Sequence, residues 1–116
     1  MNKAIIIGNI GNDPEFKQVG ESGVLNISVA TSEKFKDRNG ELQEKTEWHR
    51  INYWGKGAEG LSRILQKGHK VAVEGSIHTR QYDKDGEKRY ATEIKAFNVE
   101  LLERKQRQAD SGGDDW

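Results

Sequence analysis

Alternating apolar and polar residues divide the chain into short segments with the two-residue period of β-strands. The clearest segment covers residues 24–32, where Leu25, Ile27 and Val29 alternate with Asn26 and Ser28. Because side chains of a strand point alternately to its two faces, the three apolar residues would line one face together. The same pattern predicts strands at residues 3–10, 47–54, 70–82 and 90–102, and a shorter strand near residues 15–19.

One segment has the periodicity of a helix instead. Ala58, Leu61, Ile64 and Leu65 recur at the spacing of one helix face, between the third and fourth predicted strands. This spacing predicts a short amphipathic helix. Gly68 follows it and is the type of residue that commonly ends a helix.

The order of these elements predicts the fold. Two connections contain hairpin-type dipeptides, Asn39-Gly40 and Asp85-Gly86, in which glycine tolerates positive φ. Three strands, a helix and two further strands, with long second-to-third and fourth-to-fifth connections, predict an all-β fold with one short helix: a five-stranded, partly open Greek-key barrel of the OB type. This domain would cover residues 1–102. Residues 103–116, rich in Gly, Asp and Gln, would form a disordered tail with an acidic end.

Composition excludes several classes of protein. The 116 residues suffice for one domain, and only 33% of them are apolar, so the core must be modest. There is no cysteine, and the three histidines lack the spacing of a metal site, so we expect neither disulfides nor a bound metal. No apolar run is long enough for a membrane span or a signal peptide, which favours a cytoplasmic location without membrane contact.

Total charge does not distinguish between partners, because 19 basic residues balance 19 acidic ones. The last fourteen residues hold three basic and four acidic groups, so residues 1–102 carry 16 basic against 15 acidic groups, a net charge of +1. The position of the basic residues is therefore more informative than their number.

The segment WHRINYWGK, residues 48–56, concentrates aromatic and basic residues. Alternation would place both tryptophans on one face with an arginine and an asparagine: Trp48, Arg50, Asn52 and Trp54. The other face would carry a histidine, an isoleucine and a tyrosine: His49, Ile51 and Tyr53. Exposed indoles beside an arginine are typical of a surface that stacks nucleic-acid bases, and six residues of strand separate the indoles by roughly 20 Å. The alternative is that both tryptophans pack beneath loops as part of the core.

Two further segments combine basic and aromatic residues. Residues 34–38, KFKDR, place Phe35 between Lys34 and Lys36, and residues 80–90, RQYDKDGEKRY, surround the second predicted turn. An OB barrel uses two such loops to hold a nucleic-acid strand, so the three segments together favour a nucleic-acid partner. Each segment alone is also compatible with a solvated charged hairpin.

The chain resembles a known family over about residues 1–102. The segments MNKAIIIGNIGNDPE, ISVATSEKFKDRNGE, TEWHRINYWGK, LQKGHKVAVEGSIHTRQY and RYATEI are similar, in order and spacing, to the OB domain of bacterial single-stranded DNA-binding proteins. The resemblance implies a non-enzymatic protein without a cofactor that coats and protects single-stranded DNA during replication, recombination and repair. It also implies a homotetramer, and a cytoplasmic, nucleoid-associated location.

The resemblance further implies residue roles. Four positions would stack bases, although the first and last are often tryptophan in the family: Phe35, Trp48, Trp54 and Tyr82. Together with the basic residues of the two loops, nine side chains would contact phosphates: Lys3, Lys34, Lys36, Arg50, Lys56, Lys67, Arg80, Lys88 and Arg89. His49 matches a subunit-contact position, and the alternative for it is an ordinary hydrogen-bonded core residue.

The end of the chain departs from the family pattern. The long linker and the acidic tip ending in Pro-Phe are absent, and the sequence ends in DSGGDDW. Asp114, Asp115 and Trp116 keep an acidic and aromatic character. They are interpreted either as a short divergent tip that recruits replication and repair proteins or as a solvated terminus without a partner.

A competing motif begins at Gly55. Residues 55–60 follow the pattern G-x-G-x-x-G between a strand and a helix, and Glu74 lies 19 residues after Gly55, as in a dinucleotide-binding fingerprint. The preceding strand alternates with polar residues, however, whereas a first Rossmann strand is apolar on both faces. We therefore interpret the glycines as a tight corner. An OB module that binds RNA or a replication protein is the other alternative to binding single-stranded DNA.

Overall fold

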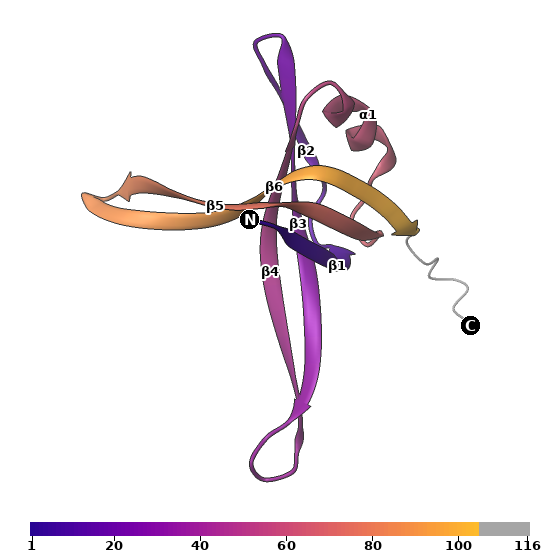
Figure 1. Ribbon diagram of the computed structural model, residues 1–116, viewed down its shortest axis with the longest axis vertical. Helices are drawn as coiled ribbons and strands as arrows, with labels where there is room; N and C mark the ends of the chain where they lie inside the picture. The colour runs from indigo at the N-terminus through magenta and orange to yellow at the C-terminus, as the bar shows by residue number, and fades with distance from the viewer. Residues whose placement is uncertain (105–116) are drawn as a thin grey trace.

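The computed structural model describes residues 1–104, which form six strands and one helix (Figure 1). In chain order these are β1 (Ala4–Ile10), β2 (Glu15–Val19), β3 (Ser22–Lys36), β4 (Leu42–Trp54), α1 (Gly57–Ile64), β5 (Lys70–Lys84) and β6 (Glu87–Glu103). The strand predicted near residues 15–19 is present as β2, and β6 extends one residue past the predicted boundary at residue 102. Within the described residues, no helix has the length and apolar character to cross a membrane.

Five of the strands close into a barrel, as the order of elements predicted. The pairing runs β1–β5–β6–β4–β3 and returns to β1, and only the β4–β6 pair is parallel. The closing pair is short, because β1 meets β3 only at Asn9 and Ile10. Gly8 permits this closure: a Cβ atom there would lie 2.2 Å from the carbonyl oxygen of Ala30, so no larger residue fits without moving the backbone.

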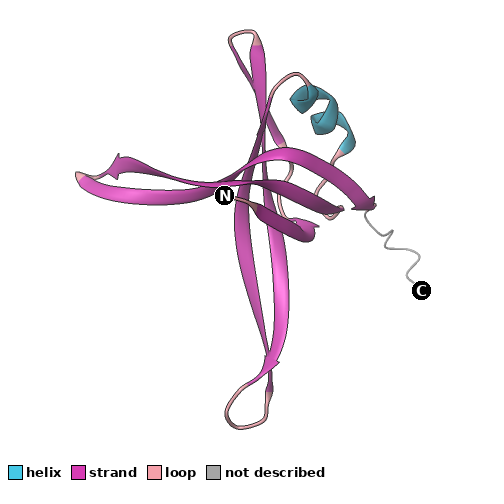
Figure 2. Ribbon diagram, viewed as in Figure 1, coloured by secondary structure: helices cyan, strands magenta, loops and turns pink. Residues whose placement is uncertain are grey.

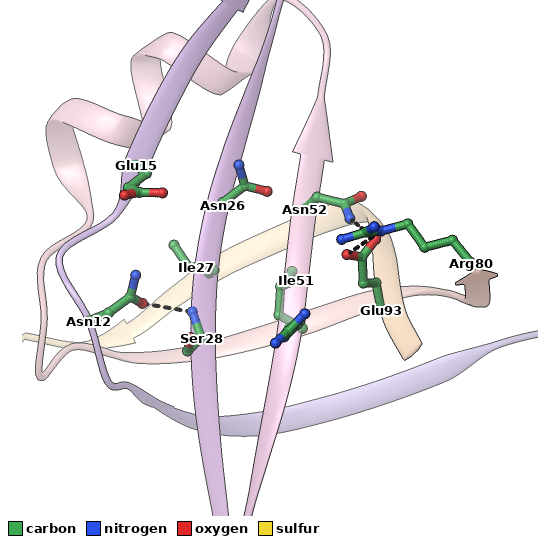
Figure 3. Close-up of a pocket in the computed structure, with 10 residues that line it drawn as sticks. Asn12, Glu15, Asn26, Ile27, Ser28, Ile51, Asn52, Arg80 and Glu93 are labelled. Atoms are coloured by element: carbon green, nitrogen blue, oxygen red, sulfur yellow. Dashed lines mark hydrogen bonds and ion pairs between the residues drawn. The ribbon is translucent and has the colours of Figure 1, made fainter. Parts of the chain in front are cut away.

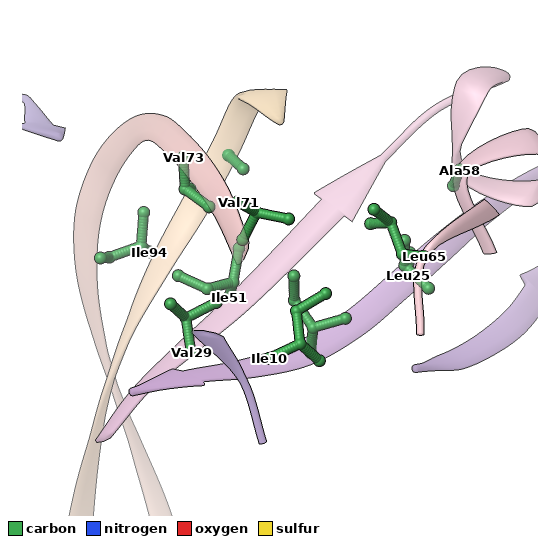
Figure 4. Packing of buried hydrophobic residues seen from close by; sticks show 11 residues of the cluster. Ile10, Leu25, Val29, Ile51, Ala58, Leu65, Val71, Val73 and Ile94 are labelled. Atoms are coloured by element: carbon green, nitrogen blue, oxygen red, sulfur yellow. The ribbon is translucent and has the colours of Figure 1, made fainter. Parts of the chain in front are cut away.

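The barrel interior is filled by small aliphatic side chains from every barrel strand (Figure 4). Alternation on β3 buries Leu25, Ile27 and Val29, as predicted, and leaves Asn26 and Ser28 on the outer face. Ile51 from β4 is 2% exposed and packs in the same cluster. The residues closest to full burial are Ile10, Leu25, Ile51, Val29, Val71 and Val73. Burial of this modest set supplies most of the driving force for folding.

The helix α1 follows β4 and contacts β2, β3 and β4. It buries Ala58 completely, and Leu65 directly after it is 2% exposed. Two details of the helix prediction are wrong. Ile64 is half exposed, because a helix of only two turns buries a narrow face. Gly68 does not end the helix, because the chain becomes extended at Leu65. Gly68 instead has φ 94° in the turn before β5, where its N–H donates to the carbonyl of Ile10.

The two segments predicted as long loops are paired strands (Figure 2). β3 and β4 stay in register from Val24 opposite Trp54 to Lys36 opposite Leu42, and β5 and β6 pair until Lys84 meets Glu87. These two-stranded arms project from the barrel in different directions (Figure 1). Their backbone groups pair across the ribbon, so the strands continue without a buried face and without alternating hydrophobicity. The sequence pattern therefore showed only the barrel part of each strand.

The turns at the arm tips differ in construction. Asp85 and Gly86, with φ 52° and 80°, form the two-residue connection of the β5–β6 arm, and positive φ at both positions is the requirement of a type I′ hairpin. In the β3–β4 arm, residues 37–41 form a longer loop in which Gly40 has φ 80°. Both glycines therefore have the positive φ that the sequence predicted.

Candidate nucleic-acid interface

The outer face of β4 carries the two tryptophans that the sequence singled out. Trp48 is 59% exposed and Trp54 is 47% exposed. Arg50, between them on the same face, is also exposed, whereas Ile51 on the opposite face is in the core. The predicted division of this strand into two faces is confirmed, and the alternative that both indoles belong to the core is wrong.

Trp48 is supported from beneath by a glycine. A Cβ atom on Gly11 would lie 2.1 Å from Cζ3 of the Trp48 ring, so the indole lies directly against the Gly11 backbone. This contact fixes one side of the ring while more than half of the side chain stays exposed. Sequence reasoning did not identify Gly11, because the contact joins the β1–β2 connection to a strand more than thirty residues later.

A groove of about 310 Å³ lies on the outer face of β3 and β4, and its β4 residues lie between Trp48 and Trp54 in the sequence (Figure 3). Its floor comes from Asn26, Ser28, Arg50 and Asn52, which pair in register: Asn26 with Asn52, and Ser28 with Arg50. One wall is formed by the β1–β2 connection and the start of β2, and the other by the β5–β6 arm. The wall residues are Asn12, Glu15, Arg80 and Glu93.

A hydrogen-bonded network holds the groove wall that is formed by the β5–β6 arm. Glu93 accepts a bond from Nε of Arg80 at 3.1 Å through Oε2 and from Nδ2 of Asn52 at 3.2 Å through Oε1. Arg80 reaches Glu93 diagonally across the small Ala91, its register partner, and its guanidinium also lies 5.5 Å from the ring centroid of Tyr82. The network joins β4 to the base of the β5–β6 arm and fixes the orientation of three polar side chains beside the groove.

The other two predicted stacking residues lie on the arms. Tyr82 shares a face of the β5–β6 arm with Arg80 and Arg89, so it continues the surface of the groove wall. Phe35 is 48% exposed, but continuous register places it on the opposite face of the β3–β4 ribbon from Trp48 and Trp54. The structure therefore brings Trp48, Trp54 and Tyr82 to the groove side and does not bring Phe35 there.

A side-chain hydrogen bond holds the groove wall that is formed by the β1–β2 connection. Asn12 accepts a hydrogen bond from the backbone N–H of Ser28 at 2.7 Å, which ties the β1–β2 connection to β3. Asn12, Asn26, Asn52 and Glu93 are polar groove residues that the sequence analysis did not name as site residues. Alternation along the strand predicts Asn52 on the tryptophan face. No local pattern predicts Glu93 in the groove, because its position depends on the β4–β6 pairing.

Comparison with known proteins agrees with this geometry. Residues 1–102 match the model of the Single-strand binding protein family. The chain belongs to that family. It is 48% identical over 116 residues to single-stranded DNA-binding protein 1 of Chlorobaculum tepidum, covering 97% of this chain and 69% of that protein.

Solved structures of family members have the same fold. The SSB of Plasmodium falciparum, solved in complex with ssDNA, superimposes with a TM-score of 0.82 at 34% identity, covering 89% of this chain and 96% of that one. The wild-type single-stranded DNA-binding protein from Thermus aquaticus gives a TM-score of 0.76 at 30% identity, covering 89% of this chain and 50% of that one.

Three of the nine cations predicted to contact phosphates have carboxylate partners. Arg80 is paired with Glu93, as described above. Nζ of Lys3, directly before β1, lies 2.5 Å from Oε2 of Glu74 on β5, and Nη2 of Arg89 lies 3.3 Å from Oε1 of Glu87. The other six form no ion pair within residues 1–104: Lys34, Lys36, Arg50, Lys56, Lys67 and Lys88. Register places Lys34 and Lys36 on the same face of the β3–β4 arm as Trp48. It places Lys88 on the face of the β5–β6 arm that does not carry Tyr82.

His49 and Asp37 make local polar contacts. The Nε2 atom of the half-buried His49 lies 2.9 Å from Oγ1 of Thr31 on β3. Asp37, in the loop of the β3–β4 arm, accepts bonds from the backbone N–H groups of Glu41 and Asn39 and from Gln43. The bond from Glu41 is the main reason why the pKa of Asp37 lies below its ordinary value. An aspartate ahead of an Asn-Gly pair is a known turn signal, which the sequence analysis passed over.

The G-x-G-x-x-G segment forms a corner, as interpreted from the sequence. Gly55 has φ 123° and donates its N–H to the carbonyl of Gly23, and the helix begins two residues later at Gly57. The strand before it belongs to a closed barrel, not to a doubly wound sheet. In residues 1–104, no group of three or more His, Cys, Asp or Glu side chains is arranged to hold a metal ion. The predicted tail residues Asp114, Asp115 and Trp116 lie outside the described residues.

Proposed function

We propose that this protein binds single-stranded DNA with little sequence preference and that it coats and protects the strand during replication, recombination and repair. The observation that carries this proposal is the outer face of β4, where two exposed indoles lie on either side of Arg50, which itself lines a polar groove. Membership of the single-strand binding protein family supports it. In this proposal the protein binds DNA without catalysing a reaction. It is located in the cytoplasm, in association with the nucleoid.

Binding combines stacking with charge. Trp48 and Trp54 stack bases at two separated points of an extended strand, and each stacked base contributes roughly 1–3 kcal/mol. Tyr82 provides a third stacking ring on the wall formed by the β5–β6 arm. Arg50 lies between the indoles, and the exposed lysines of the β3–β4 arm and the β4–α1 corner attract the phosphates. Release of the counterions condensed on DNA then favours binding and makes the affinity depend on salt.

A DNA strand must follow a longer path to reach Phe35 than to reach the two tryptophans. Because it lies on the opposite face of its arm from Trp48, a strand bound along the groove must pass around the β3–β4 arm to stack on it. Single-stranded DNA is flexible enough for such a path. We therefore propose that Phe35 binds a segment of the strand that lies outside the groove, on the far side of the arm.

We also propose that the protein assembles as a homotetramer. Ile5 and Ile7 on the outer face of β1 are 68% and 54% exposed, and β1 is bonded on one side by β5 but on the other only at Asn9 and Ile10. An exposed apolar strand with a free edge is a surface that pairs with another chain. His49 is proposed as a subunit contact, with its bond to Thr31 orienting the ring.

Truncation of one indole tests the stacking surface. In a Trp54→Ala variant we expect the affinity for oligo(dT) to fall by roughly 5- to 150-fold, the equivalent of one lost stacking contact. The far-UV circular dichroism and the urea midpoint should stay close to those of the wild type, because the indole is half exposed. A variant that unfolds, or that binds oligo(dT) as tightly as the wild type, would contradict the proposed role of this face.

Competition tests the choice of nucleic acid. A labelled oligo(dT) bound to the protein is challenged with unlabelled single-stranded DNA, duplex DNA or RNA of equal length. We expect single-stranded DNA to displace the label at the lowest concentration, because duplex bases are stacked on each other and unavailable to the indoles. Displacement by RNA at equal or lower concentration would favour the alternative of an RNA-binding module.

A further inference from the structure

The outer face of β6 carries an exposed cation and an exposed aromatic ring. Lys95 is exposed and Phe97 is 59% exposed, whereas Ile94 and Ala96, which alternate with them, are buried in the barrel. Because alternate residues of a strand share a face, the two outer side chains are neighbours on the same side of β6. Neither residue belongs to the set of DNA contacts predicted from the sequence.

This face of β6 continues the tryptophan face of β4. The two strands are parallel neighbours, and their register pairs Arg50 with Glu93 and Asn52 with Lys95. The side chains of Asn52 and Glu93 meet across the two strands, with Nδ2 of Asn52 3.2 Å from Oε1 of Glu93 (Figure 3). The outer faces of β4 and β6 therefore form one continuous surface at this point.

Phe97 lies on this surface at the level of Trp54. The last register pair of β4 and β6 is Tyr53 with Ala96, so Trp54 and Phe97 are the residues that follow this pair on the two strands. Phe97 is also the extra residue of a β-bulge, because it has no register partner on β5. A bulge changes the direction of a side chain, and this one leaves the ring more exposed than the indole of Trp54.

The charges around Phe97 favour a nucleic-acid strand over a second copy of the chain. Lys95 forms no ion pair within residues 1–104. An unpaired ammonium group is costly to bury in an apolar interface, whereas a phosphate neutralises it. The exposed Ile5 of the proposed subunit contact is separated from β6 by Glu74 on β5. Glu74 is paired with Lys3, so a polar boundary lies between the two apolar regions.

We propose that Lys95 and Phe97 form a further part of the DNA-binding surface, the β6 lane, in which Lys95 contacts a phosphate and Phe97 stacks a base next to the one on Trp54. This inference rests on the proposed binding of single-stranded DNA. A cation beside an exposed ring is the combination that binds a single strand without reading its sequence. Beyond Phe97 the exposed residues of β6 include Asn98 and the acidic Glu100, so the lane ends at the ring.

Substitutions of Phe97 test the stacking contact, with fluorescence anisotropy of labelled oligo(dT) as the measurement. We expect Phe97→Ala and Phe97→Leu to weaken binding by roughly fivefold or more, because leucine keeps the apolar bulk but has no aromatic face. Phe97→Tyr should bind like the wild type. Tyr90→Ala is the matched control, because Tyr90 is an exposed ring on the other face of β6, and its affinity should also stay near that of the wild type.

Substitution of Lys95 tests the phosphate contact. In Lys95→Gln the slope of the logarithm of affinity against the logarithm of salt concentration should become less steep by about 0.7, the contribution of one phosphate of a single strand. This contribution is additional to that of the cations predicted from the sequence. Lys88→Gln is the matched control and should keep the wild-type slope, because Lys88 is an exposed lysine on the other face of β6.

Light scattering without DNA separates the β6 lane from a subunit contact. Phe97→Ala should have the molar mass of the wild-type particle, and a lower mass would identify the ring as a subunit contact and overturn the lane. Wild-type affinity in Phe97→Ala, or a wild-type salt slope in Lys95→Gln, would also overturn it while the wild type still binds oligo(dT). Absence of oligo(dT) binding by the wild type would instead overturn the proposed function.

Discussion

Single glycines allow neighbouring strands of the barrel to approach each other closely. At Gly75, a Cβ atom would lie 2.3 Å from the carbonyl oxygen of Lys95, and at Gly8 one would meet the carbonyl of Ala30. Both contacts are with backbone of a neighbouring strand, which cannot move aside without breaking the sheet. Gly75 also lies at a register shift between β5 and β6. Glycine in a strand commonly marks such a close approach or bulge.

We expect Gly75→Ala to lower the free energy of unfolding by about 1–3 kcal/mol, the usual cost of forcing an extra carbon into a packed site. Gly60→Ala is the matched control, because Gly60 lies in α1 and a Cβ atom there meets nothing within 4 Å. This change should raise stability by about 0.5–1 kcal/mol, since alanine favours a helix more than glycine does. Urea unfolding measures both variants. An unchanged midpoint for Gly75→Ala would mean that the strands separate easily at this point.

At the scale of elements, the two arms are ribbons with distinct faces. The β5–β6 arm presents Tyr82 with Arg80 on the groove side, whereas Tyr90, which is 68% exposed, lies on the other face opposite Gln81. The two tyrosines are similar in chemistry and close in position along the arm, and they differ in which face they occupy. They therefore provide an internal comparison for the path of the DNA.

We expect Tyr82→Ala to weaken the binding of oligo(dT) by roughly fivefold or more, the equivalent of losing one stacked base. Tyr90→Ala should leave the affinity near that of the wild type. Fluorescence anisotropy of a labelled oligonucleotide measures both. If Tyr90→Ala has the larger effect, the DNA follows the other face of the arm.

The loop of the β3–β4 arm depends on a carboxylate. Because acceptance of the Glu41 N–H lowers the pKa of Asp37 below its ordinary value of 3.8, the folded protein keeps this charge where the unfolded chain has begun to bind protons. The stabilising effect is complete above about that pH. It is lost as the pH falls further, through the lower pKa of the folded state.

An NMR titration should therefore show a midpoint for Asp37 below 3.8, with the amide shift of Glu41 following the same curve. In Asp37→Asn the amide shift of Glu41 should lose this transition. Asp83→Asn, on the other arm, should leave it unchanged. A midpoint for Asp37 at or above the ordinary value would show that the loop does not stabilise the charged form.

The pattern of apolar and polar residues was sufficient to predict the strands of the barrel but not those of the two arms. Leu25, Ile27 and Val29 alternate because one face of β3 is in the core, and the same alternation separated Trp54 from Ile51 on β4. Beyond residue 32 and before residue 47 both faces are solvated, so hydrophobic periodicity ends although the strands continue. The arm register, the face of Phe35 and the place of Glu93 in the groove all depend on pairing between distant segments, which no local pattern contains.

At the scale of the whole molecule, the distribution of charge matters more than its sum. The net charge of the chain is zero, yet six of the nine predicted phosphate contacts lack a carboxylate partner within residues 1–104. If these residues except Lys88, which lies on the Tyr90 face of its arm, neutralise phosphates, the logarithm of the affinity should fall with the logarithm of salt concentration with a slope of about −3.5 per protomer. Assembly through β1 would bring several such surfaces into one particle and lengthen the strand that it can bind.

The central claim is that the exposed indoles of β4 stack on the bases of single-stranded DNA, and tryptophan fluorescence tests it most directly. The measurement uses a Trp116→Phe variant, so that Trp48 and Trp54 are the only sources of the signal. Titration with oligo(dT) should quench the fluorescence strongly, and rising salt should reverse the quenching as the complex dissociates. Unchanged fluorescence at a concentration where anisotropy shows the oligonucleotide to be bound would contradict the account.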